Sequence, residues 1–229
     1  MTIEQKSNND IVQIKFRILE LSFKHRISHI GSCLTAAPII YECYANRPEK
    51  HRFVLSAGHA GLALYVVLEH FKIIPDAELL LTRDGIHPVR IGNEAYIHCS
   101  TGSLGLGATI AVGIAASLPD HRVDCMCSDG EASEGAIYEA LNYSRNAGLN
   151  NLHFHFNLNG FSALDKTDTV RMTKVLTTIH DGIKIHHTEG KLREFPFLNG
   201  LDAHYYVMNN NNWATVCEWK TKFDFINEK

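Results

Sequence analysis

The sequence predicts an α/β protein with an open, mostly parallel sheet that carries helices on both faces. Short apolar segments alternate along the chain with longer amphipathic or small-residue segments, a pattern typical of parallel sheets covered on both sides. Of the 229 residues, 45% are hydrophobic, which is enough to bury a substantial core. No internal repeat, low-complexity linker or second boundary interrupts the chain, so we expect one domain over residues 1–229.

The individual elements follow from hydrophobic periodicity. Apolar Ile11, Ile14, Ile18 and Leu21 recur at helical spacing and predict a helix over residues 10–25. Further helices are expected at residues 35–44, 60–71, 104–117 and 133–147, and short apolar runs predict buried strands at 52–56, 123–127 and 152–157. In the last third the pattern weakens, and it predicts strands near 182–186, 204–208 and 214–219, with an exposed turn at 209–212.

Composition and charge exclude several classes of partner. The 22 basic and 25 acidic residues give a formal net charge of -3, without long runs of like charge, which disfavours nucleic acids and membranes. No apolar stretch approaches the roughly 20 residues that cross a bilayer, and the polar start lacks the apolar core of a signal peptide. The six cysteines show no CxxC spacing. We therefore expect a cytoplasmic protein with free, mostly buried thiols, whose partners are small molecules or proteins.

The most informative residues follow two predicted strands. Asp129 and Gly130 come just after the strand at 123–127, and Asn159 and Gly160 just after the strand at 152–157. The carboxyl ends of parallel strands share one edge of a sheet, where a following helix presents its positive N-terminus to anions. Carboxylate, amide and carbonyl oxygens suit Mg²⁺ that is held together with a diphosphate. The two glycines fit close approach of the backbone to phosphate.

An Asp-Gly followed 30 residues later by an Asn-Gly resembles the thiamine diphosphate (ThDP) motif, and its interior resembles the transketolase family. The same stretch also carries Glu134-Gly135 and Glu139-Ala140, where the alpha subunits of 2-oxo-acid dehydrogenases differ. Other family-like segments are Ser28-His29-Ile30-Gly31-Ser32, residues 52–60, Gly85-Ile86-His87-Pro88 and residues 100–107. The resemblance is strongest over residues 10–167.

The resemblance implies roles for the residues around the cofactor. His59 would touch the diphosphate, and Gly130 would lie beside it. Asp129, Asn159 and the main-chain carbonyl of Phe161 would bind Mg²⁺.

The resemblance also assigns residues on the other sides of the cofactor. Gly102 and Leu104 would line the cofactor, and His29 and His87 would face the substrate as catalytic residues. Glu134, with Glu139, would meet its counterpart in a carboxylate network across a dimer interface.

Other interpretations of these residues stay open at this point. The glutamates at 134 and 139 also suit an exposed helix face, and any of the histidines could be an ordinary hydrogen-bonded polar group. His153 and His155, or His186 and His187, could hold zinc. Cys125 and Cys127 share one face of a buried strand, which favours core packing.

The sequence departs from the family at four points. Ser128 and Ser28 each replace a glycine, and His98 stands where a glutamate is usual. The tail at residues 217–227 resembles the final strand of the family domain. The Gly-Lys-Gly loop before it, and the substrate-facing histidine that follows that loop, are missing from the pattern. These departures leave the substrate open.

The resemblance implies a split enzyme. In the family, the glutamate that activates the aminopyrimidine ring belongs to a pyrimidine-binding domain, and we expect a second chain, in an α2β2 heterotetramer, to carry it. The expected activity is transfer of a two-carbon ketol unit from a ketose or ketose phosphate to an aldehyde, with ThDP and Mg²⁺ as cofactors. The alternatives are ThDP-dependent decarboxylation of a 2-oxo acid with acyl-anion transfer, and a non-catalytic, degenerate subunit.

Overall fold

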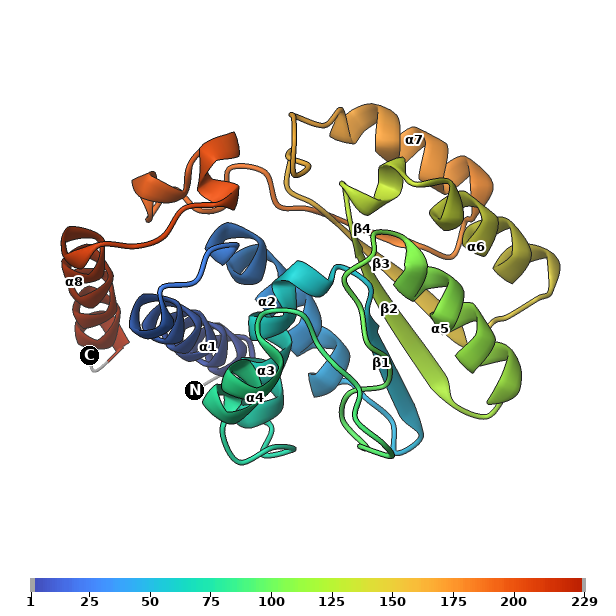
Figure 1. The fold of residues 1–229 in the computed structure, drawn as a ribbon, viewed down its shortest axis with the longest axis horizontal. Helices are drawn as coiled ribbons and strands as arrows, with labels where there is room; N and C mark the ends of the chain where they lie inside the picture. The colour runs from blue at the N-terminus through green and yellow to red at the C-terminus, as the bar shows by residue number, and fades with distance from the viewer. Residues whose placement is uncertain (1–2, 228–229) are drawn as a thin grey trace.

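The computed structural model describes residues 3–227 and contains one four-stranded sheet in the order β1-β2-β3-β4. The strands are β1 (His51–Leu55), β2 (Arg122–Ser128), β3 (Leu152–Leu158) and β4 (Lys184–His187). All three neighbouring pairs are parallel. The predicted open parallel sheet is therefore confirmed, and the carboxyl ends of its strands lie along one edge (Figure 1).

Helices cover both faces of the sheet (Figure 1). One side carries α1 (Ile3–His25), α2 (Ile30–Ala45), α3 (Gly61–His70) and α4 (Ala77–Asp84), and the other carries α5 (Leu106–Ser117), α6 (Gly135–Asn146) and α7 (Thr169–Ile179). The helix α8 (Asn210–Asn227) packs on the outside of α1, and short 3₁₀ turns occur at Gly58–Ala60, Glu131–Ser133, Pro196–Leu198 and Leu201–His204. Within residues 3–227, no helix combines the length and the apolar character that crossing a membrane requires.

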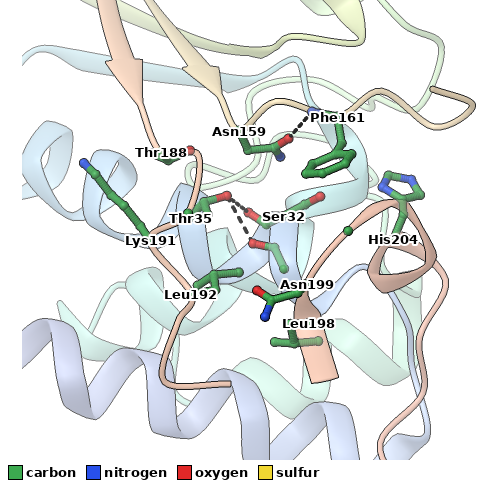
Figure 2. A pocket seen from close by; sticks show the side chains of 13 residues that line it. Ser32, Thr35, Asn159, Phe161, Thr188, Lys191, Leu192, Leu198, Asn199 and His204 are labelled. Carbon is green, nitrogen blue, oxygen red and sulfur yellow. Dashed lines mark hydrogen bonds between the residues drawn. The ribbon is translucent and has the colours of Figure 1, made fainter. Parts of the chain in front are cut away.

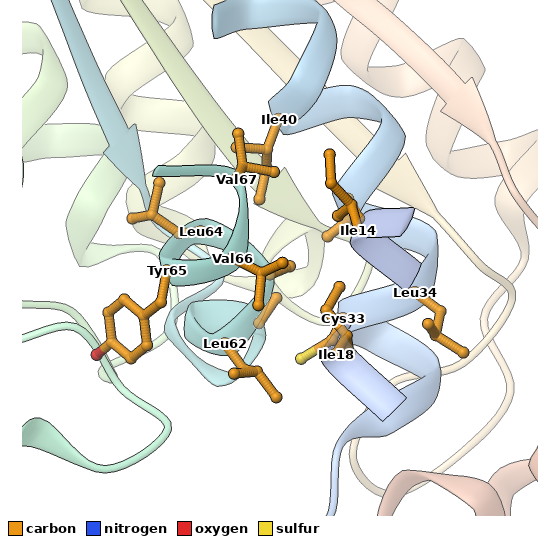
Figure 3. Packing of buried hydrophobic residues seen from close by; sticks show 14 of the residues in the cluster. Ile14, Ile18, Cys33, Leu34, Ile40, Leu62, Leu64, Tyr65, Val66 and Val67 are labelled. Atoms are coloured by element: carbon orange, nitrogen blue, oxygen red, sulfur yellow. The ribbon is translucent and has the colours of Figure 1, made fainter. Parts of the chain in front are cut away.

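Two hydrophobic clusters hold these layers together because strand side chains alternate between the faces. Phe53, Leu55 and Met126 point into the larger cluster, which includes Ile18 of α1 (Figure 3). The smaller cluster packs α5 and α6 against the opposite face; its strand residues include Val54, Cys125, Cys127, Phe154 and Phe156. Cys125 and Cys127 are thus core residues, as packing alone predicts.

The outer edge of β1 is closed by a side chain. The Nδ1 atom of His98 lies 3.1 Å from the amide nitrogen and 2.9 Å from the carbonyl oxygen of Phe53. An exposed strand edge offers unpaired backbone groups to other chains. His98, where the family usually has a glutamate, thus covers part of that edge.

The last third differs most from the sequence prediction. Residues 204–208 form no strand, and residues 214–219 lie inside α8. The reason is aromatic packing at helical spacing: Trp213 stacks on Phe23 with ring centres 5.1 Å apart, and Trp219 meets Phe195 at 5.1 Å. The tail at 217–227, which resembled a final strand, is helical for the same reason.

Two asparagines of the predicted turn at 209–212 instead begin α8. The Asn212 side chain accepts a hydrogen bond from the Asn209 amide, and the Asn209 side chain accepts one from the Asn212 amide. This reciprocal pairing satisfies donors that a helix start leaves free. The helices α4 and α7, which periodicity did not predict, begin at the capping residues Asp76 and Asp168.

Two glycines of α5 give a matched test of the packing of this helix. A β-carbon at Gly107 would lie 2.5 Å from Ser56 Cα, whereas one at Gly113 would meet nothing within 4 Å. We expect Gly107→Ala to lower the free energy of unfolding by about 1–3 kcal/mol through overpacking. Gly113→Ala should raise it by about 0.5–1 kcal/mol through helix propensity. Urea unfolding of both variants checks this; equal effects would contradict the close α5–β1 contact.

Candidate functional site

Loops at the carboxyl edge of the sheet enclose a cavity of about 200 Å³. The loop after β1 brings His59, the turn after β2 brings Asp129, and the loop after β3 brings Asn159. The lining residues are His29, Ser32, His59, His87, Gly102, Leu104, Ser128, Asp129, Gly130, Asn159, Phe161, Ser162, Ala163, His204 and Tyr205. The structure therefore brings together every predicted site residue except Glu134.

Asp129 joins the ends of β2 and β3. Its Oδ2 atom accepts hydrogen bonds from the amides of Gly160 (2.9 Å) and Phe161 (3.0 Å) and from the Thr167 hydroxyl (2.9 Å). Burial raises the pKa of the Asp129 carboxyl, although these hydrogen bonds oppose the shift. Its Oδ1 atom is buried, and no described residue gives it a hydrogen bond. A buried carboxylate oxygen without a partner is costly, so this atom is suited to a cation.

Asn159 and Phe161 complete a set of oxygen donors. The Asn159 Oδ1 atom accepts a hydrogen bond from the Phe161 amide at 2.9 Å, which fixes the amide side chain at the cavity wall (Figure 2). Gly160 between them has φ 91°, a left-handed conformation that favours glycine. The need for glycine at 160 is therefore conformational. At Gly130, by contrast, φ is ordinary and the nearest protein atom to an added β-carbon is 3.8 Å away.

Four histidines surround the cavity. The ring of His29 lies with its centre 4.5 Å from that of His204 and 5.8 Å from that of His59, and His87 packs beside Gly102. Burial, with a smaller contribution from the neighbouring imidazoles, lowers the pKa of His29 to about 4 and that of His59 to about 3. Burial also lowers the pKa of His87 and His204. The four rings are therefore neutral at neutral pH.

His29 has an unusual backbone that fixes its position. It precedes α2 with φ 64°, and its ring Nδ1 lies 2.8 Å from the Ser28 hydroxyl. Its amide donates to the carbonyl of His204 at 3.0 Å, so α2 and the C-terminal segment are joined beside the cavity. A left-handed conformation at a histidine is a strained feature of the kind found at functional sites.

His204 and Tyr205 are the site residues that sequence reasoning missed. They lie in a segment predicted as a strand, in a region where no substrate-facing histidine was recognised. His204 also lines a second cavity of about 80 Å³, which shares Ser32, Asn159 and Phe161 with the first (Figure 2). Neither local periodicity nor a motif marks these two residues, because the segment reaches the site through tertiary packing alone.

Glu134 is not part of the cavity wall. It is exposed at the start of α6, next to Gly105, and Glu139 is exposed on the same helix. Leu104 and Leu106, 41% and 48% exposed, lie in the same loop-to-helix region as Gly105. The role of Glu134 at an interface stays a prediction.

A second cluster of metal-ligand residues lies inside the fold. Atoms of Cys43, Asp124 and His155 lie within 4.8 Å of one another, and all three residues are buried. Every Asp124 oxygen is already satisfied: Oδ1 by His155 (2.9 Å) and Arg122 (3.0 Å), and Oδ2 by His51 (2.9 Å) and Arg122 (2.8 Å). His155 also lies 3.3 Å from His186. Because the hydrogen bonds account for the cluster, zinc is not needed to explain these histidines.

Comparisons with known proteins agree with this geometry. A family model described as "Transketolase, thiamine diphosphate binding domain" matches residues 29–180. Transketolase from Mus musculus is 37% identical over 158 residues, which are 60% of this chain and 25% of that protein. A Phocaeicola vulgatus protein, named as one of the subunits of an apulose-4-phosphate transketolase, is 32% identical over 154 residues, 59% of this chain and 54% of that protein. The chain thus matches about a quarter of one relative and about half of the other.

Solved transketolases share the fold. The enzyme from Campylobacter jejuni superposes with a TM-score of 0.69 at 20% identity, covering 96% of this chain and 43% of that one. The enzyme from Leishmania mexicana gives 0.63 at 20% identity, covering 82% and 37%. Since the family model spans more than half of the chain, and the cavity contains the residues of its motif, the chain belongs to the family of transketolase thiamine diphosphate binding domains.

Proposed function

We propose that this chain binds Mg²⁺ and the diphosphate of ThDP as one subunit of a heteromeric, transketolase-like transferase. The enzyme moves a two-carbon ketol unit from a ketose or ketose phosphate to an aldehyde. The observation that carries the proposal is the unpartnered Oδ1 of Asp129, which faces buried oxygen donors and neutral histidines at the carboxyl edge of a parallel sheet. Ligands of open α/β sheets bind at this edge.

The donor set fits Mg²⁺. Asp129 offers one negative oxygen, Asn159 one amide oxygen and Phe161 its carbonyl, all hard ligands of the type that Mg²⁺ prefers. Protein sites of this ion use few side chains and leave its other positions to phosphate and water. The open space beside Gly130 suits a phosphate close to the backbone. These residues would hold the ion and so offset the charge of the diphosphate.

The histidines suit a neutral, hydroxyl-rich substrate. A neutral imidazole donates one hydrogen bond and accepts another, so it can orient sugar hydroxyls or move a proton at a ring nitrogen. His59 and His204 would contact the diphosphate side, and His29 and His87 the substrate side. Bound ThDP would supply the electron sink for the carbanion. The cavity walls would exclude water from that centre.

A second polypeptide would complete the active site. The support is the Phocaeicola vulgatus relative, whose name marks it as one of several chains of its enzyme and of which this chain matches about half. Leu104 and Leu106 are exposed beside Gly105 and Glu134, and an interface core of this kind is typically apolar. The partner would cover this surface and bring the glutamate that activates the aminopyrimidine. An α2β2 assembly in the cytoplasm follows from the same proposal.

Asp129→Asn tests the metal site. The amide oxygen can still accept from Gly160, Phe161 and Thr167, while the unpartnered oxygen and the charge are lost. We expect ThDP affinity in the presence of Mg²⁺ to fall about 100-fold or more, since even outer-shell changes cost metal sites 10–100-fold. Isothermal titration of the assembled enzyme measures this, with the exposed Asp181→Asn as control. Unchanged affinity would remove Asp129 from the site.

His59→Ala and His29→Asn separate the two sides of the cofactor. Asparagine tolerates the left-handed backbone at position 29, so the helix start is preserved. We expect His59→Ala to raise the ThDP dissociation constant about 10-fold, through loss of a hydrogen bond to a charged group. His29→Asn should lower kcat about 100-fold with little change in cofactor affinity. Steady-state kinetics and cofactor titration decide between them, and an exchange of the two effects would reverse the assignments.

The need for a partner is tested by mixing. The purified chain with ThDP, Mg²⁺, ketoses and 2-oxo acids should show no turnover, and activity should appear when the partner with the pyrimidine-binding domain is added. Mass spectrometry of the products distinguishes ketol transfer from decarboxylation of a 2-oxo acid. Robust turnover by this chain alone contradicts the split-enzyme proposal, and silence of the assembled pair with bound cofactor indicates a degenerate subunit.

A further inference from the structure

Glu131 is a fully buried carboxylate that contacts no cation among residues 3–227. It begins the 3₁₀ turn Glu131–Ser133, two residues after Asp129. Its Oε1 atom accepts hydrogen bonds from the Ser56 hydroxyl and from the Gly105 amide (3.0 Å). Its Oε2 atom accepts one from the Ser128 amide (3.0 Å). One side chain therefore binds three segments that are far apart in the sequence.

Each of the three donors lies close to a residue of the cavity. Ser56 directly follows β1, three positions before His59, Gly105 directly follows Leu104, and Ser128 directly precedes Asp129. The segments also approach each other closely without Glu131. A β-carbon at Gly58 would lie 2.9 Å from the Gly102 amide nitrogen. Their relative position thus has little freedom, and Glu131 is the polar group common to all three.

We infer that Glu131 is a positioning residue that fixes the diphosphate loop of Asp129, the His59 turn and the Gly102–Leu104 loop relative to one another. The inference rests on the proposed function. Glu131 does not line the cavity, so it acts on the cofactor only through these three loops. Preorganised ligands bind more tightly because the loops lose less freedom on binding.

The chemistry requires a carboxylate at this position. Three donors converge on its two oxygens, and an ionised carboxylate only accepts hydrogen bonds. Glutamine has the same shape but replaces one oxygen with an NH₂ group. That group would face the Ser128 amide or the Gly105 amide, and two donors cannot satisfy each other. At least one loop would then be released, although the side-chain volume is unchanged.

Glu131→Gln and Ser56→Ala test the inference in the full chain and in its assembled complex. Ser56→Ala removes a single donor and leaves the carboxylate in place, so it gives a milder variant in case Glu131→Gln does not fold. Glu49→Gln, on an exposed residue that precedes β1 at the opposite end of the strand, is the matched control. Hydrogen exchange by mass spectrometry reports on each segment separately, and calorimetric titration with ThDP and Mg²⁺ reports on the cofactor.

We expect faster exchange in residues 57–59 and 102–106 with unchanged exchange in β3 and α2, and a ThDP dissociation constant raised about 10-fold by Glu131→Gln and less by Ser56→Ala. Exchange that rises uniformly would mean a general structural role and would overturn the inference. So would unchanged ThDP affinity in Glu131→Gln when the unmodified complex binds ThDP. If the unmodified complex binds no ThDP, the proposed function itself fails.

Discussion

The hydrogen bonds to a single carboxylate oxygen of Asp129 determine how the ends of β2 and β3 meet. By accepting from Gly160, Phe161 and Thr167, Oδ2 draws the loop after β3 onto the turn after β2. The geometry of that loop leaves the other oxygen buried and without a partner among the described residues. The same contacts thus build the cavity wall and create the negative group inside it, which is why the fold and the candidate cofactor site cannot be separated in this protein.

The parts of the structure that periodicity could predict are those in which local sequence and tertiary environment agree. The strands at 52–56, 123–127 and 152–157 are short apolar runs that become buried on both faces, so pattern and packing give the same answer. Asp129, Asn159 and the three predicted histidines were accessible for a related reason. They directly follow strands or lie within motifs, and the topology of a parallel sheet brings such positions to one edge.

The remainder depends on contacts that short windows of sequence do not contain. Trp213 and Trp219 look compatible with a strand until Phe23 and Phe195 are placed beside them. His204 enters the cavity because its carbonyl binds the His29 amide, 175 positions earlier in the chain. Glu131 resembles any acidic residue at a helix start, and only the convergence of Ser56, Gly105 and Ser128 distinguishes it. Tertiary packing, and not local preference, sets these features.

The buried charge of Asp124 has a consequence for how the strands can align during folding. In the observed register, Asp124 faces the α2 side, where Arg122, His51 and His155 satisfy it. A slip of β2 by one residue would turn Asp124 toward the apolar side chains under α5 and α6 and leave its charge unpaired. Such a misaligned sheet would lose several kcal/mol. The network around Asp124 therefore discriminates against neighbouring registers, and it holds the β2 end, with Asp129, at the correct height along the edge.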